Sequence, residues 1–182
     1  MRYLPTVTET IAPWVDFSRI PLATLQAAAD RGTAVHAACA NIARALPVIG
    51  VSVECAGYVA SFVGWFDKIV EEALLVEERL FDEANGYCGQ IDLLVSTKGG
   101  ELWLVDLKSP VILSKSWKVQ IAAYGRLCDL WSVKNNVNID RCGSLRLRKD
   151  GGIPSMDWYE GSALQDFNIF LSALNCFRFF KG

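Results

Sequence analysis

Three charged residues interrupt two apolar, strand-like runs between positions 89 and 108. Asp92 stands in the first run, and Asp106 and Lys108 stand in the second, on either side of a turn signal at positions 98–100. Unpaired charge is costly to bury, so two explanations stay open. The charges pair with one another, or the two carboxylates bind a divalent cation. The spacing of all three favours the metal site.

A β-hairpin would bring these charges together. Side chains alternate between the faces of a strand, so Asp106 and Lys108 share one face and the apolar residues around them point to the other. A three-residue loop at 98–100 would place Asp92 opposite Asp106, on the same face. We therefore expect one polar cluster beside a buried core.

The surrounding motifs resemble a known family. GQID at 89–92 and VDLK at 105–108 resemble the GxxD and DxK motifs of the PD-(D/E)xK nuclease superfamily, most closely its RecB-like, phage-type exonuclease branch. RGTAVH at 31–36 resembles the GxxxH motif, and QIAAY at 120–124 resembles the QxxxY motif. All four motifs occur in the family order.

The resemblance implies a metal-dependent exonuclease that hydrolyses phosphodiester bonds in DNA with Mg²⁺ or Mn²⁺. By analogy, the metal ligands are His36, Asp92, Asp106 and the backbone carbonyl of Leu107. Asp106 replaces the glutamate that is common in the family, which bears on the choice of metal. No iron–sulfur cluster is expected, because the six cysteines lack the required downstream trio.

The resemblance also assigns catalytic and substrate-binding roles. Lys108 would position or activate the attacking water beside the two acids, and Glu77, twelve residues before Gly89, would hold a second metal through water. The resemblance implies that Gln120 and Tyr124, on one helix face, align the substrate, and the nearby Lys115 and Lys118 are expected to meet its phosphates.

Taken alone, several of these residues have ordinary explanations. A lone histidine on an alanine-rich helix, such as His36, is more often structural than a ligand. Glu77 fits equally well as a solvated strand residue paired with Arg79 or a lysine.

The elements that must position these residues alternate helices and strands. An irregular lead-in at 1–21 contains at most a short helix near 14–19. Helices are expected at 22–46, as one interrupted helix or two, at 56–73, after a loop that follows Pro110 within 111–134, and at 162–181. A first strand at 74–81 precedes the hairpin, and two more strands lie within 137–159.

This order predicts an α/β (α+β) fold in a single domain over residues 1–182. The resemblance implies a restriction-endonuclease-like αβββαβ core, with a central mixed sheet flanked by helices. The catalytic core would occupy 22–134, and 135–182 would supply C-terminal strands and a helix.

Composition limits the class of protein. A net charge of −2 argues against a general nucleic-acid coating protein, although a local basic patch would still meet phosphates. Its expected members are Lys115, Lys118, Arg126, Arg146, Arg148 and Lys149. The chain has no run of eighteen apolar residues and no signal-peptide pattern at its start, so we expect a cytoplasmic protein without a membrane partner.

The expected partner is DNA, and the family branch suggests phage or prophage recombination or repair with a single-strand annealing protein. An aromatic face on the last helix suggests a homo-oligomer. Two alternatives stay open: an endonuclease of the same fold, and a catalytically inactive DNA-binding or assembly module.

Overall fold

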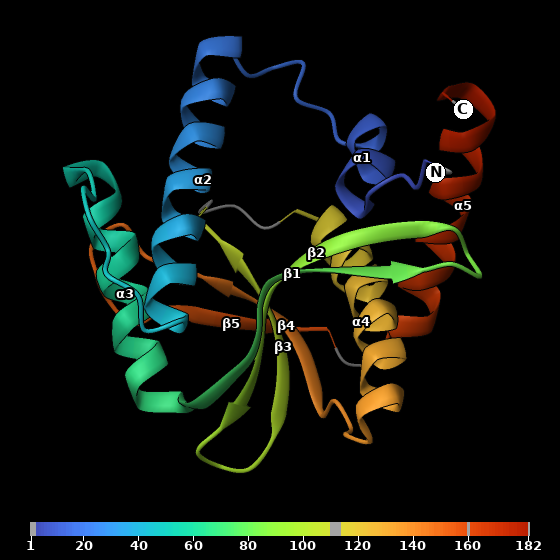
Figure 1. The fold of residues 1–182 in the computed structure, drawn as a ribbon. Coiled ribbons are helices and arrows are strands. Elements are labelled where there is room, and N and C mark those ends of the chain that lie inside the picture. The colour runs from blue at the N-terminus through green and yellow to red at the C-terminus, as the bar shows by residue number, and fades with distance from the viewer. Residues whose placement is uncertain (1–2, 110–113, 160, 182) are drawn as a thin grey trace.

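The computed structural model describes residues 3–109, 114–159 and 161–181, in which a five-stranded sheet lies between two groups of helices (Figure 1). The strand order is β1-β2-β3-β4-β5, with β3 and β4 parallel and the other neighbours antiparallel. The strands are β1 Val70–Asp82, β2 Tyr87–Thr97, β3 Leu102–Lys108, β4 Arg141–Arg146 and β5 Ser155–Trp158. The predicted α+β class with a mixed sheet is confirmed.

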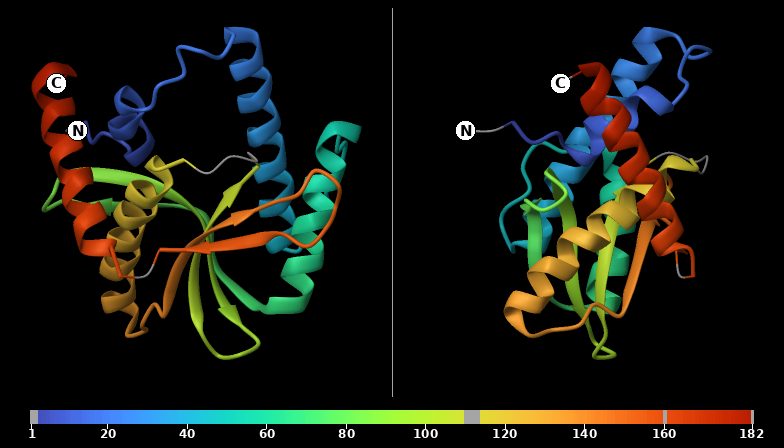
Figure 2. Two further views of the ribbon diagram at one scale, coloured as in Figure 1. Left: turned by 180° about the vertical axis from the view of Figure 1, so that it is seen from behind. Right: turned by 90° about the vertical axis from the view of Figure 1, so that its right-hand side faces the viewer.

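The helices cover both faces of this sheet (Figures 1 and 2). They are α1 Val7–Ile11, α2 Leu22–Ala43, α3 Val53–Ile69, α4 Ser116–Asn135 and α5 Ala163–Lys181, with a 3-10 turn η1 at Ala12–Trp14. One apolar cluster joins the sheet to α2 and α3, and a second joins it to α1, α4 and α5. None of these helices, within the described residues, combines the length and apolar character of a membrane span.

The β2–β3 hairpin has the predicted register. Leu93 pairs with Val105 and Leu94 with Leu104, and the Gly100 N–H closes the loop by donating to the Thr97 carbonyl at 2.8 Å. Continuing this register by one step places Asp92 opposite Asp106. Alternation then sends Trp103, Val105 and Leu107 into the α2–α3 cluster, whereas Leu102 and Leu104 share the other face with Asp106 and join the second cluster.

The β1–β2 pair is strongly bent (Figure 1), and Glu77 lies within it in an unusual conformation. Val76 pairs with Leu93 and Glu78 with Ile91, so Glu77 lies opposite Asp92 in the register. Glu77 has a left-handed backbone with φ of 49°. For a residue other than glycine this conformation costs on the order of 1–3 kcal/mol and is often found at functional sites.

The lead-in is more regular than predicted, because residues 7–11 form α1 and η1 follows it at 12–14. The short helix allowed near 14–19 does not form beyond Trp14. Thr6 starts α1 through a capping box, in which its side chain accepts from the Glu9 N–H at 3.1 Å and Glu9 accepts from the Thr6 N–H at 2.8 Å. The sequence carries this signal as Thr-x-x-Glu at residues 6–9, and it was not among the predicted elements.

Two further boundaries differ from the expectation. The α2 helix runs uninterrupted through Gly32, and α3 ends at Ile69, where β1 begins four residues earlier than predicted. Pairing of Val70 with Thr97 and of Ala73 with Val95 holds residues 70–73 in the sheet, which a helical pattern alone does not reveal. The loop expected after Pro110 begins at 110–113, outside the described residues.

Candidate metal centre

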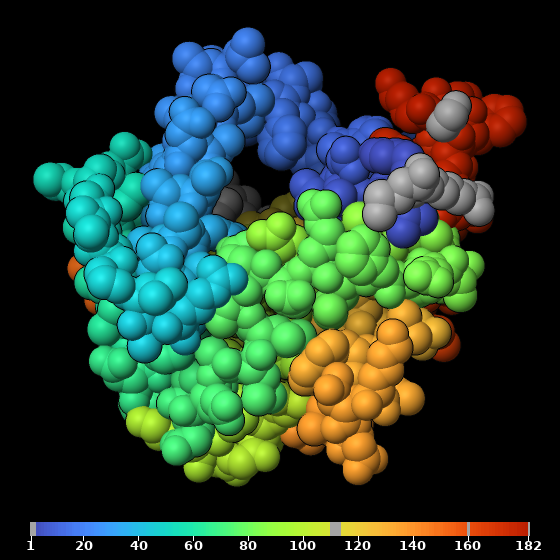
Figure 3. All heavy atoms as spheres, in the orientation of Figure 1, coloured from blue at the N-terminus to red at the C-terminus, as the bar shows by residue number. Residues whose placement is uncertain are grey.

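A cavity of about 760 Å³ opens between α2, the β1–β2 pair and the α1–α4 side of the molecule. Figure 3 shows the surface hollowed between α2 and the β1–β2 pair, below the segment that joins η1 to α2. Seven residues predicted from the sequence line this cavity: His36, Glu77, Asp92, Asp106, Lys108, Gln120 and Tyr124. Segments that lie far apart in the sequence therefore meet at one place.

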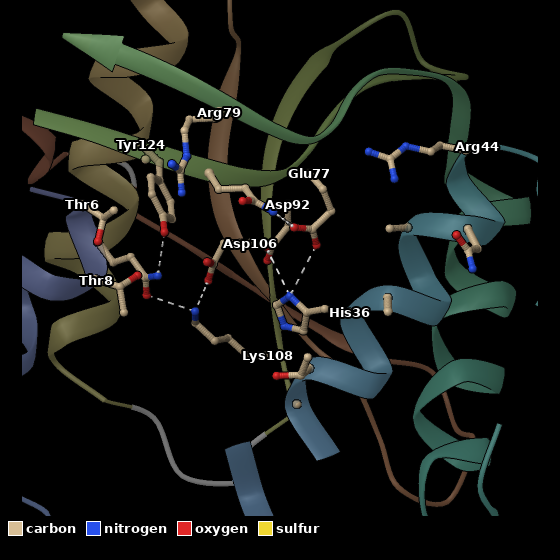
Figure 4. Close-up of a pocket in the computed structure, with 18 residues that line it drawn as sticks. Thr6, Thr8, His36, Arg44, Glu77, Arg79, Asp92, Asp106, Lys108 and Tyr124 are labelled. Carbon is tan, nitrogen blue, oxygen red and sulfur yellow. Dashed lines mark hydrogen bonds and ion pairs between the residues drawn. The ribbon is translucent and has the colours of Figure 1, made fainter. Parts of the chain in front are cut away.

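His36, Glu77 and Asp92 form a compact group of ligand-type atoms (Figure 4). Their nitrogen and oxygen atoms lie within 4.8 Å of one another. His36 Nδ1 is 3.2 Å from Asp92 Oδ1 and 3.8 Å from Glu77 Oε1. An imidazole and two carboxylates at this spacing can bind one divalent cation.

Neighbouring groups orient these ligands. The Leu107 N–H donates to Asp92 Oδ2 at 2.6 Å, and Gln90 Nε2 donates to Glu77 Oε2 at 2.5 Å. Each carboxylate thus has one oxygen occupied by a protein donor and the other facing His36. Such supporting contacts are typical of metal sites.

Asp106 lies beside this group but has other partners. Its Oδ2 is 2.6 Å from Lys108 Nζ and accepts a hydrogen bond from Ser144 Oγ at 3.1 Å. The pairing of Asp106 with Lys108 is one of the two explanations that the sequence left open, whereas Asp92 belongs to the His36 group. Mutual pairing therefore accounts for Asp106 and Lys108, and cation binding at Asp92 stays a prediction.

Lys108 begins a polar chain that reaches α4. Lys108 Nζ donates to Gln120 Oε1 at 3.0 Å, and Gln120 Nε2 donates to the Tyr124 hydroxyl at 3.1 Å. Gln120 and Tyr124 stand one helical turn apart, so both point from α4 into the cavity. The Lys108 ammonium is held between a buried acid and a helix.

The electrostatics of His36 favour its protonated form when no cation is bound. Burial lowers the pKa of His36, but the charge and hydrogen bond of Asp92, together with the charge of Asp106, outweigh burial and raise it to about 9. A cation that binds His36 must therefore displace a proton.

The two buried aspartates respond differently. Burial raises the pKa of Asp92, yet His36, Lys108 and the Leu107 N–H together hold it below its ordinary value. Burial raises the pKa of Asp106 and the charge of Asp92 adds to this, so it stays above its ordinary value despite Lys108. Asp92 is thus the more strongly acidic of the pair and the better ligand for a cation.

Other cavity residues were not identified from the sequence. Arg44, near the end of α2, and Arg79, on β1, are exposed cations on the cavity wall, and α1 adds Thr6 and Thr8. Arg79 does not pair with Glu77, which instead contacts His36 and Gln90. The capping box at Thr6 is a sequence signal for the α1 wall.

The expected basic patch does not form around this cavity. Lys115 and Lys118 line a separate cavity of about 620 Å³ between α1, α4 and α5. Arg146 pairs with Asp157, and Arg148 pairs with Asp150. Lys118 is two residues from Gln120, which turns it to another side of α4.

Comparison with known proteins adds no assignment. Neither a scan against protein-family models nor a search of curated proteins returned a match.

Proposed function

We propose that this chain is a metal-dependent deoxyribonuclease, with exonuclease action favoured. The observation that carries the proposal is the convergence of His36, Glu77 and Asp92 with the Asp106–Lys108 pair in one open cavity. In the sequence these groups belong to separate motifs of the nuclease resemblance. The order α3-β1-β2-β3-α4-β4 also supports a restriction-endonuclease-like core.

The donor set fits a hard divalent cation. Carboxylate oxygens suit Mg²⁺ and Mn²⁺, and Mn²⁺ also accepts an imidazole nitrogen. We propose His36, Glu77 and Asp92 as its ligands, with Asp106 and the Leu107 carbonyl as neighbouring donors. When bound, such an ion draws charge from the scissile phosphate and lowers the pKa of a nearby water.

The remaining residues act on the water and the strand. Lys108, held by Asp106 and Gln120, presents its ammonium to the cavity, where it can orient the attacking water and stabilise negative charge that develops on the phosphate. Gln120 and Tyr124 keep Lys108 in place and contact the substrate. The negative charges of Asp92 and Asp106 on one cavity wall would repel the DNA phosphate, and a bound cation would neutralise this repulsion.

A binding module without catalysis is the main alternative. Nothing in such a module requires Lys108 to be fixed by two partners beside a carboxylate–imidazole group, so this arrangement favours catalysis. Self-association is supported by exposed aromatic rings at the end of α5, where Phe179 is 81% and Phe180 72% accessible. An annealing-protein partner in phage-type recombination rests on the sequence resemblance.

The test is digestion of three DNA substrates with Mg²⁺, Mn²⁺ or EDTA. Linear duplex with a 5′ phosphate, linear single strands and closed circles should be incubated with the wild type and with Asp92→Asn. The proposal predicts metal-dependent loss of linear DNA with circles spared, and at least about a hundredfold slower loss for Asp92→Asn. Nicking of circles would instead identify an endonuclease, and no cleavage of any substrate would favour the binding module.

A further inference from the structure

The Glu77 side chain lies in the candidate metal centre, and the backbone of this residue has an unfavourable conformation. Its φ of 49° lies in the left-handed region, although regular pairs flank it at Val76–Leu93 and Glu78–Ile91. Glutamate adopts this region rarely, because its Cβ crowds the backbone. The surrounding structure must therefore hold Glu77 in place.

Two contacts from outside β1 hold this residue. Arg44 Nη2 donates to the Val76 carbonyl at 2.5 Å, and this carbonyl belongs to the peptide bond that leads into Glu77. On the side-chain end, Gln90 Nε2 donates to Glu77 Oε2 at 2.5 Å, which leaves Oε1 facing His36. Figure 4 shows Arg44 and His36 both extending from α2 toward the Glu77 side of the cavity.

We propose that Arg44 and Gln90 are positioning residues that hold Glu77 as the third ligand of a divalent cation. This inference rests on the proposed metal centre and deepens it. The α2 helix supplies His36 as a ligand and, about two turns later, Arg44 as the brace for the ligand on the opposite wall. Docking of α2 against β1 therefore completes the site.

The sign of one effect separates positioning from simple electrostatics. Removing a positive charge near a cation site strengthens cation binding when the charge acts only through its field. If Arg44 instead positions Glu77, Arg44→Ala weakens cation binding. Gln90 carries no charge, so Gln90→Ala removes its hydrogen bond to the Glu77 side chain without changing the net charge near the cation site.

The experiment is calorimetric titration of the DNA-free protein with Mn²⁺. We expect Arg44→Ala and Gln90→Ala each to weaken Mn²⁺ affinity about three- to tenfold, and Arg44→Lys to recover part of the loss. In the Glu77→Ala background, which is itself weakened, adding either substitution should cause no further loss. Arg31→Ala, on the same helix but paired with Glu54, is the matched control and should bind like the wild type.

Several outcomes would overturn the proposal. Arg44→Ala that binds Mn²⁺ as tightly as the wild type, or more tightly, would remove Arg44 from the positioning role. If the substitutions of Arg44 and Gln90 weaken Mn²⁺ affinity equally in the wild-type and Glu77→Ala backgrounds, these two residues act independently of Glu77. Both residues are exposed, so their substitution should not prevent folding, and circular dichroism checks this.

The result is separable from the nuclease proposal. Wild type that binds Mn²⁺ with the predicted coupling but cleaves no DNA would support the positioning role and contradict the nuclease function. If both variants still bind Mn²⁺ tightly and cleave DNA, the result would support the nuclease function and contradict the positioning role. Wild type that binds no Mn²⁺ would overturn both.

Discussion

The ring of Tyr124 lies directly against the backbone of Gly89. A Cβ atom at position 89 would lie 2.7 Å from Tyr124 Cε1 and 2.9 Å from Leu127 Cδ1. The first residue of the GQID motif thus makes room for the last residue of QIAAY. This contact fixes α4 against β2 and sets the position of the Gln120–Tyr124 pair relative to Asp92.

Gly89→Ala should therefore destabilise the fold. The added methyl meets side chains that are themselves buried, so we expect a loss of about 1–3 kcal/mol in the free energy of unfolding, measured by urea denaturation. Gly64→Ala in α3 is the control, because no neighbour lies within 4 Å of its Cβ position. Alanine there should be neutral or stabilising by about 0.5–1 kcal/mol. Equal stability of Gly89→Ala and wild type would contradict the packing account.

Cation affinity should rise with pH. The pKa of His36 is about 9 without a cation, so below this pH each bound cation releases the His36 proton. Mn²⁺ affinity should increase up to about tenfold per pH unit between pH 6.5 and 8.5. Titrations in buffers with different ionisation enthalpies measure the released proton, and affinity that is independent of pH would exclude His36 as a ligand.

His36 also makes the stability of the cation-free fold depend on pH, and this stability should fall as pH rises, whereas cation affinity rises. Its folded pKa of about 9 exceeds the ordinary value of 6.5, so its stabilising contribution is complete below pH 6.5 and is lost as pH rises toward 9. With EDTA present, urea denaturation should show a fall in stability over this window. A His36→Gln variant should show a flatter profile, whereas an equally steep profile in that variant would assign the effect to another group.

Arg79 should contribute to substrate affinity. It is exposed on the cavity wall, near Tyr124 in Figure 4, where its guanidinium can meet a DNA phosphate. Arg79→Ala should raise KM about tenfold, change kcat little and reduce the salt dependence of binding by about one charge. Lys134→Ala, exposed in the last turn of α4, is the charge-matched control. An effect confined to kcat would argue against a phosphate contact.

Local sequence rules predicted the centre of the fold well. The hairpin register follows from the alternation of Asp106 and Lys108 with apolar neighbours and from a three-residue loop, and both are properties of adjacent residues. The family resemblance of the motifs indicated further residues that line the same cavity. The side of α4 on which Lys118 lies also follows from helical spacing, because residues two apart, such as Lys118 and Gln120, do not share a helix face.

Other features depend on contacts that sequence patterns do not contain. Glu77 has a left-handed conformation that propensity disfavours, and the hydrogen bonds around it come from Arg44, at the end of α2, to the Val76 carbonyl and from Gln90, on β2, to the Glu77 side chain. The early start of β1 is set by pairing with β2, which overrides the helical pattern. Asp106 is also engaged by Ser144 of β4, from a segment to which no motif was assigned.

The rate of Mn²⁺-dependent cleavage by Lys108→Gln tests the central claim most directly. Removing the ammonium breaks a buried ion pair with Asp106, so the variant should lose several kcal/mol in its free energy of unfolding. Glutamine is chosen because its side chain can still hydrogen-bond to Asp106 and Gln120. At Mn²⁺ saturation, verified by calorimetry on folded protein, cleavage of linear duplex DNA should fall at least about a hundredfold from the wild-type rate. Wild-type cleavage by the Mn²⁺-loaded variant, or wild-type cleavage that persists in EDTA, would contradict the account.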